Sequence, residues 1–72
     1  MADPQISMTD LLSASARAAL TANELIYELR QILDYLSTVK PKPTRKIRAV
    51  EVTIAHLQAE VAAYNAIGAA AG

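Results

Sequence analysis

The sequence predicts an all-α fold in which two long antiparallel helices form an α-hairpin, and it predicts that oligomerisation completes this hairpin. Three observations support the prediction. Apolar residues recur at helical spacing in two long segments. Between these segments lies Lys40-Pro41-Lys42-Pro43-Thr44, where two prolines remove backbone donors and keep the residues before them out of the α region. The apolar residues are also too many for a single seam between two helices to cover.

The first helix is predicted over about residues 8–39, with Ser7 as its N-cap and Asp10 in its first turn. Residues 1–6 are expected to form an extended lead-in. The main stripe consists of apolar or small residues at three-then-four spacing, namely Met8, Leu11, Ser15, Ala18, Ala22, Leu25, Leu29, Ile32, Leu36 and Val39. A second set follows one position behind and widens this face: Leu12, Ala19, Ile26 and Leu33.

The second helix is predicted over about residues 45–67, after a connector at 40–44, with Thr44 as its N-cap and Gly68 at its end. Residues 1–72 are then one small hairpin domain with a short apolar tail. The stripe of the second helix is Ile47, Val50, Ile54, Leu57, Val61, Tyr64 and Gly68. Alanines surround this stripe and permit another helix to approach closely.

A turn centred on Lys42 gives antiparallel partners whose residue numbers add up to roughly 84. The facing residues are then Leu36 with Ile47 and Arg48, Leu29 with Ile54, Leu25 with Leu57, Ala22 with Val61, and Ala18 with Tyr64. In this register Leu12, Ile26, Leu33 and the alanine face of the second helix cannot all point into the seam. The register also leaves an overhang at or beyond the end of the second helix, which contains Ile6, Met8, Leu11 and Leu12.

A chain of 72 residues needs more support than its own core supplies. Such a domain buries only about 60% of its unfolded surface, and its core contributes about 3–5 kcal/mol. Cysteine is absent, so disulfides cannot add to this. That leaves oligomerisation or binding to something larger, and the sequence favours a homo-oligomer. Its predicted packing and oligomer interface comprises Leu11, Leu12, Leu25, Ile26, Leu29, Ile32, Leu33, Leu36, Ile47, Val50, Ile54, Leu57, Val61 and Tyr64.

The net charge is zero, but five of the seven basic residues fall within positions 40–48. They are Lys40, Lys42, Arg45, Lys46 and Arg48, and we call them the basic tip. Positive charge in the first turn of a helix opposes the helix dipole, so stability alone does not account for it. The basic tip is expected to contact an anion or an acidic protein surface, or to be a solvated loop. Nucleic acid is the weaker alternative, because no aromatic residue interleaves the cluster for base stacking.

The sequence gives little support for catalysis, a metal or a membrane span. His56 and Glu60 are four residues apart and offer only two metal ligands. The serines have no nearby general base, and no glycine-rich phosphate loop occurs. We therefore expect no enzyme activity and no cofactor. Polar residues interrupt the apolar segment 49–71, and the N-terminus has no apolar run. The expected location is soluble, either cytoplasmic or in an extracellular or virion assembly.

The function expected from these features is that of a structural subunit that self-associates into a bundle, ring, filament or shell-associated assembly. Small virion components and secretion-needle subunits have a similar general build, a resemblance of fold alone. One alternative is a dimeric four-helix-bundle regulator that binds nucleic acid through the basic tip. Another is a helical adaptor that docks into a groove of a partner protein.

Overall fold

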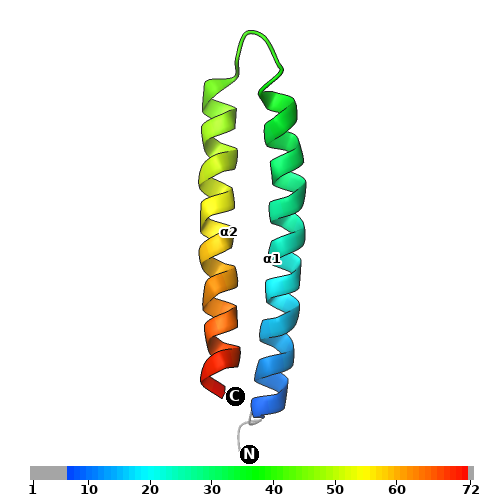
Figure 1. Ribbon diagram of the computed structural model, residues 1–72, viewed down its shortest axis with the longest axis vertical. Coiled ribbons are helices and arrows are strands. Elements are labelled where there is room, and N and C mark those ends of the chain that lie inside the picture. The colour runs from blue at the N-terminus through cyan, green and yellow to red at the C-terminus, as the bar shows by residue number, and fades with distance from the viewer. Residues whose placement is uncertain (1–6, 72) are drawn as a thin grey trace, which may run out of the picture.

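The computed structural model describes residues 7–71, with the side chains of residues 7–70, and this part of the chain is all-helical. Helix α1 (Met8–Leu36) and helix α2 (Thr44–Ala71) run antiparallel and pack against each other, joined at one end by the connector (Figure 1). The prediction of two packed helices is confirmed. The predictions for residues 1–6 and Gly72 lie outside the described residues.

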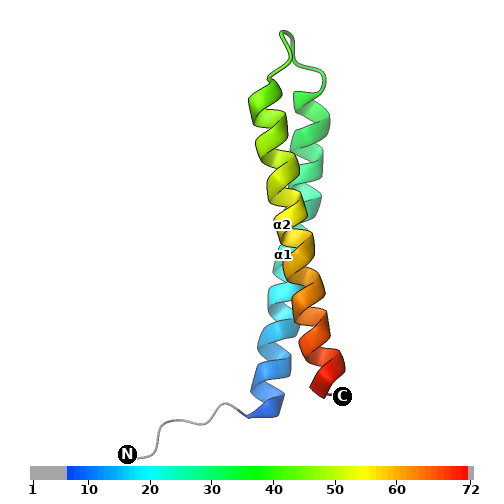
Figure 2. The ribbon, with the colours of Figure 1, turned by 90° about the vertical axis from the view of Figure 1, so that its left-hand side faces the viewer.

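The hairpin is a rod. Its radius of gyration is 17.0 Å and its principal extents are 59 × 27 × 14 Å. A compact domain of this length has a radius of gyration of about 11 Å. Figure 2 shows that the two helices cross at a shallow inclination while staying side by side. Since each helix has one neighbour, most of its circumference faces away from the other helix.

Helix α1 begins where the sequence predicts. The Ser7 backbone is extended, and its side-chain oxygen accepts a hydrogen bond from the Asp10 amide at 3.1 Å. The Ser7 carbonyl accepts the first helical bond, from Leu11. One of the helix's free N-terminal donors is thereby satisfied, and Asp10 adds a favourable charge to the first turn. The predicted N-cap is confirmed.

Helix α1 ends at Leu36, three residues before the predicted end. The Ser37 hydroxyl donates to the Leu33 carbonyl at 2.9 Å, and the Thr38 hydroxyl donates to the Tyr35 carbonyl at 2.7 Å. The Thr38 and Val39 amides then bond three residues back instead of four, which tightens the last turn. The two hydroxyls bond to carbonyls that also accept from the Ser37 and Thr38 amides, so they compete for acceptors of the last turn and favour an end to the helix before the prolines.

Helix α2 starts one residue earlier than predicted, and Thr44 is not its N-cap. The Pro43 carbonyl accepts the first helical bond, from the Ile47 amide, so Pro43 occupies the capping position. The Thr44 hydroxyl donates backwards to the Lys42 carbonyl at 3.4 Å, and the Thr44 amide donates to the same oxygen at 2.9 Å. The threonine therefore closes the connector and does not cap the helix. The Lys40–Pro41 peptide bond is cis.

Helix α2 continues through Gly68 to Ala71, so the prediction that Gly68 ends the helix is wrong. Gly68 does not adopt a positive φ, the geometry for which a terminating glycine is selected. Alanines surround it, and they favour the helix enough to carry it across one glycine at a cost of about 1 kcal/mol. The two helices are consequently almost equal, at 29 and 28 residues. The predicted overhang of α1 is therefore absent from the described residues.

The core of the hairpin is thin and consists mainly of small side chains. Ser15, Ala19 and Ala22 are buried on α1 in its N-terminal half, and Ile26 and Ile54 are buried near the middle of the rod. Small residues let two helices approach closely, but each removes little apolar surface from water. No side chain among the described residues is completely shielded from solvent.

Candidate interaction surfaces

The seam between the helices contains eleven of the predicted interface residues. Ile26 and Ile54 are buried, and the other nine are half-buried. Those nine are Leu12, Leu29, Leu33 and Leu36 on α1, with Ile47, Val50, Leu57, Val61 and Tyr64 on α2. The remaining three, Leu11, Leu25 and Ile32, are exposed. The seam thus uses most of the predicted residues, but not in the predicted register.

The register differs by one residue on α1. The sequence predicts that Leu25 faces Leu57 and that Leu12, Ile26 and Leu33 do not all fit into the seam. Leu25 is 43% exposed, whereas Ile26 is only 7% exposed. Adjacent helical residues point about 100° apart, so only one of the two can face α2. The second set of apolar residues on α1, and not the main stripe, completes the seam.

Helix α1 therefore carries two apolar stripes that share Ser15, Ala22, Leu29 and Leu36. One is completed by Leu12, Ala19, Ile26 and Leu33, and α2 covers it. The other is completed by Leu11, Ala18, Leu25 and Ile32, which are seven residues apart, and we call these four together with Val39, just past the end of α1, the flank stripe. Three of its members, Leu11, Leu25 and Ile32, are 39%, 43% and 47% exposed. Ala18 and Val39 are half-buried.

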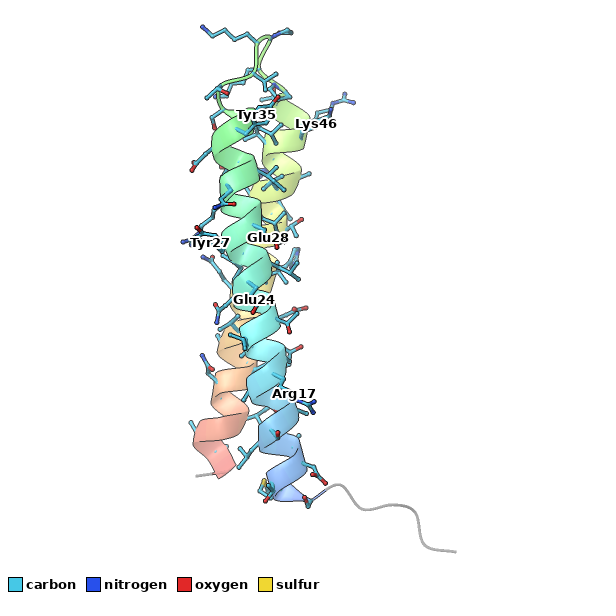
Figure 3. The ribbon with its side chains drawn as sticks, turned by 90° about the vertical axis from the view of Figure 1, so that its right-hand side faces the viewer. Arg17, Glu24, Tyr27, Glu28, Tyr35 and Lys46 are labelled. Carbon is cyan, nitrogen blue, oxygen red and sulfur yellow. The ribbon has the colours of Figure 1, made fainter. Side chains whose placement is uncertain are left out.

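Helix α2 contributes a parallel row to the same flank. The seam residues of each helix recur every seven residues, with two core positions in each repeat. In an antiparallel pair, the residues just before the first of these core positions lie on the same side of the seam in both helices. On α2 these residues are Lys46, Thr53, Glu60 and Ile67. Figure 3 looks onto α1 and shows Lys46 on the side opposite to Tyr27. This flank is mostly apolar, with one cation and one carboxylate on α2.

The opposite flank is polar. Its residues on α1 are Ala16, Asn23, Arg30 and Ser37, and those on α2 are Thr44, Glu51, Gln58 and Asn65. All eight are exposed. The two flanks of the hairpin therefore differ in chemistry, and only one of them carries a row of large apolar side chains, which lies on α1.

The outer faces of the helices carry a few further large side chains. Leu20, Tyr27 and Tyr35 are 61–68% exposed on α1, and Val52 is 43% exposed on α2. Isolated exposed apolar residues are ordinary on protein surfaces. The sequence analysis did not single out Leu20. This apolar residue interrupts the polar face of α1, and that interruption could have identified it. The outer face of α2 is mainly alanine, and Ala55, Ala59, Ala62, Ala63 and Ala66 are all exposed.

The basic tip is solvent-exposed at all five positions. Lys40 and Lys42 lie in the connector, while Arg45, Lys46 and Arg48 lie in the first turns of α2. That first turn contains no acidic residue. The Arg45 and Lys46 amides donate to no acceptor among residues 7–71. Cationic side chains and free amides at a helix N-terminus together favour an anion.

The remaining candidate groups are solvated. His56 and Glu60 are exposed, and so are Glu24 and Glu28, which point outward from α1 in Figure 3. No set of three potential metal ligands comes together among the described residues. The same part of the chain has no pocket, and neither helix in it has the length and apolarity needed to cross a membrane.

Comparison of the chain with protein-family models, with curated proteins and with solved structures finds no match in any of the three.

Proposed function

We propose that this protein is a structural subunit, a helical hairpin that self-associates into a larger helical assembly. The observation that carries the proposal is the imbalance between the thin core and the exposed apolar residues. Among residues 7–70 the hairpin buries two large apolar side chains, Ile26 and Ile54, whereas eight large hydrophobic residues stay exposed along the rod.

Free-energy magnitudes support this interpretation. Burying an isoleucine side chain contributes about 1.5–3 kcal/mol, and alanine contributes much less. Ordering each residue costs about 1.5 kcal/mol, so a chain with so few buried side chains is at best marginally stable alone. Covering exposed apolar surface with further copies supplies the missing burial. Association and stability should consequently rise together with protein concentration.

Light scattering coupled to size-exclusion chromatography tests the proposal, run over a hundredfold range of protein concentration. The expected particle has at least twice the mass of one chain, and its helicity by circular dichroism grows with concentration. A fully helical monomer at every concentration would contradict the proposal. Closed particles of one mass would indicate a bundle or ring, and mass that keeps growing would indicate a filament.

The exposure of all five cations of the basic tip favours one alternative, a dimeric regulator that binds nucleic acid. Fluorescence anisotropy with a labelled oligonucleotide tests it. Binding through the tip should weaken with salt, with a log–log slope of about −0.9 per neutralised phosphate of duplex DNA. Arg45→Gln with Arg48→Gln should reduce that slope. The matched control, Arg17→Gln with Arg30→Gln, removes the same charge elsewhere and should not. Absence of binding at low salt would eliminate the alternative.

A further inference from the structure

We propose that two copies of the hairpin associate through the flank stripe in an antiparallel, fully overlapping arrangement with Leu25 at the two-fold axis. This inference rests on the proposed self-association and specifies its surface, its symmetry and its register. Its occupant is a second copy of this chain. The support comes from the spacing of the flank stripe, from the area it offers, and from the distribution of charge along the rod.

The spacing of the stripe is compatible with two-fold symmetry. A two-fold axis that crosses the rod lays α1 on α1 and α2 on α2 of the second copy, with opposite directions. Centred on Leu25, it brings Leu25 onto Leu25 and Ala18 onto Ile32 of the other copy, and it places Leu11 beside the C-terminal end of the other α1. A small residue then meets a large one on either side of the axis, which is the complementarity that dense packing requires.

The area of this flank suits a stable dimer. A helix of 28 residues is about 42 Å long at 1.5 Å per residue, and two adjacent helices are about 20 Å wide. Full overlap therefore covers on the order of 800 Å² on each copy, close to the standard protein–protein interface. The opposite flank has the same dimensions, but seven of its eight residues are exposed and polar and would have to be desolvated, against three residues on this flank.

Charge determines the direction of the second copy. A parallel pair would bring two basic tips together at one end. The antiparallel pair separates them and places each tip beside the C-terminal end of the other copy's α2. The last turn of α2 contains no basic residue, so its partial negative charge is unopposed there. Asp10, exposed in the first turn of α1, lies at the same end of the rod.

A slipped arrangement is the alternative to full overlap. Centred on Ile32, it would leave Leu11 of each copy uncovered. Full overlap buries more apolar area and is therefore favoured.

Two experiments test this arrangement on the full chain, and the absence of native cysteine makes the first one clean. Leu25→Cys should form a disulfide-linked dimer on mild oxidation, because the two sulfurs meet at the axis. Asn23→Cys on the polar flank is the matched control and should remain reduced. Cross-linking of Asn23→Cys, or of Ile32→Cys in preference to Leu25→Cys, would overturn the arrangement.

The second experiment does not depend on an introduced cysteine. Leu11→Ala removes a side chain that only the full overlap covers, so the dimer dissociation constant should rise about three- to tenfold. In the slipped arrangement Leu11 stays uncovered, and the same change would leave the dissociation constant unaltered. Should the unmodified chain form oligomers while both experiments fail, the interface lies elsewhere and the proposed function stands. A monomer at all concentrations would remove both proposals.

Discussion

Truncation of three neighbouring large apolar residues of α1 tests which face of the helix is buried. Leu20 is 61% exposed, Leu25 is 43% exposed and Ile26 is 7% exposed. Each substitution by alanine removes three carbon atoms of the side chain. The three variants therefore differ in burial far more than in the chemistry that they delete.

The expected costs follow from these exposures. Leu20 is the most exposed of the three side chains, so its exposed fraction serves as the reference for a helical residue without tertiary contacts. Relative to it, Leu25 loses about a third of its surface and Ile26 about nine tenths. At about 0.8 kcal/mol per buried methylene, Leu25→Ala costs about 0.7 kcal/mol and Ile26→Ala about 2 kcal/mol, before a cavity term is added. Leu20→Ala should be close to neutral.

Urea unfolding followed by far-ultraviolet circular dichroism measures these differences. The order of destabilisation should be Ile26→Ala, then Leu25→Ala, then Leu20→Ala. The effect of Leu25→Ala should grow with protein concentration, because association is expected to cover that side chain further. If Leu25→Ala destabilised the dilute protein as much as Ile26→Ala, the assignment of the buried face to Ile26 would be refuted.

Three other predictions concern the helix boundaries, the close packing and the basic tip. A Cβ atom at position 68 meets nothing within 4 Å, so Gly68→Ala should stabilise the protein by up to about 1 kcal/mol in urea unfolding; destabilisation would mean that Gly68 ends the helix. Ala22 is only 4% exposed, so Ala22→Leu should cost about 1–3 kcal/mol by overpacking, whereas Ala16→Leu on the polar flank should not; equal melting temperatures would contradict the close approach of the helices. Neutralising Arg45, Lys46 and Arg48 with glutamine should preserve helicity and raise stability by about 0.3–1 kcal/mol each at low salt; unfolding would show that the tip is structural.

The sequence was sufficient to predict the two helices, the turn between them and the Ser7 cap, because each rests on local interactions. Helical spacing and the double proline are readable without knowledge of tertiary contacts. The residues at which the helices end were harder to predict from the sequence. The Ser37 and Thr38 hydroxyls compete for carbonyls of the last turn, and the alanines around Gly68 carry the helix through it. Neither outcome follows from residue preferences alone.

The buried face of α1 could not be chosen from the sequence for a physical reason. Leu11–Leu12, Ala18–Ala19, Leu25–Ile26 and Ile32–Leu33 are adjacent pairs of similar apolar residues. Either member of each pair can complete a stripe with the shared residues, so periodicity favours neither. Only the position of α2 distinguishes them. The same ambiguity leaves a second apolar stripe on α1 after α2 has covered the first.

The central claim is that one hairpin leaves apolar surface that a second copy covers. The most direct measurement is the mass of the unmodified chain in solution, compared by light scattering with that of Leu25→Asp at the same concentrations. Our account predicts that the unmodified chain forms dimers or larger particles, and that the variant, with a charge in the middle of the flank stripe, stays monomeric at the same concentrations and is less helical. Identical particle masses for the two proteins would contradict it.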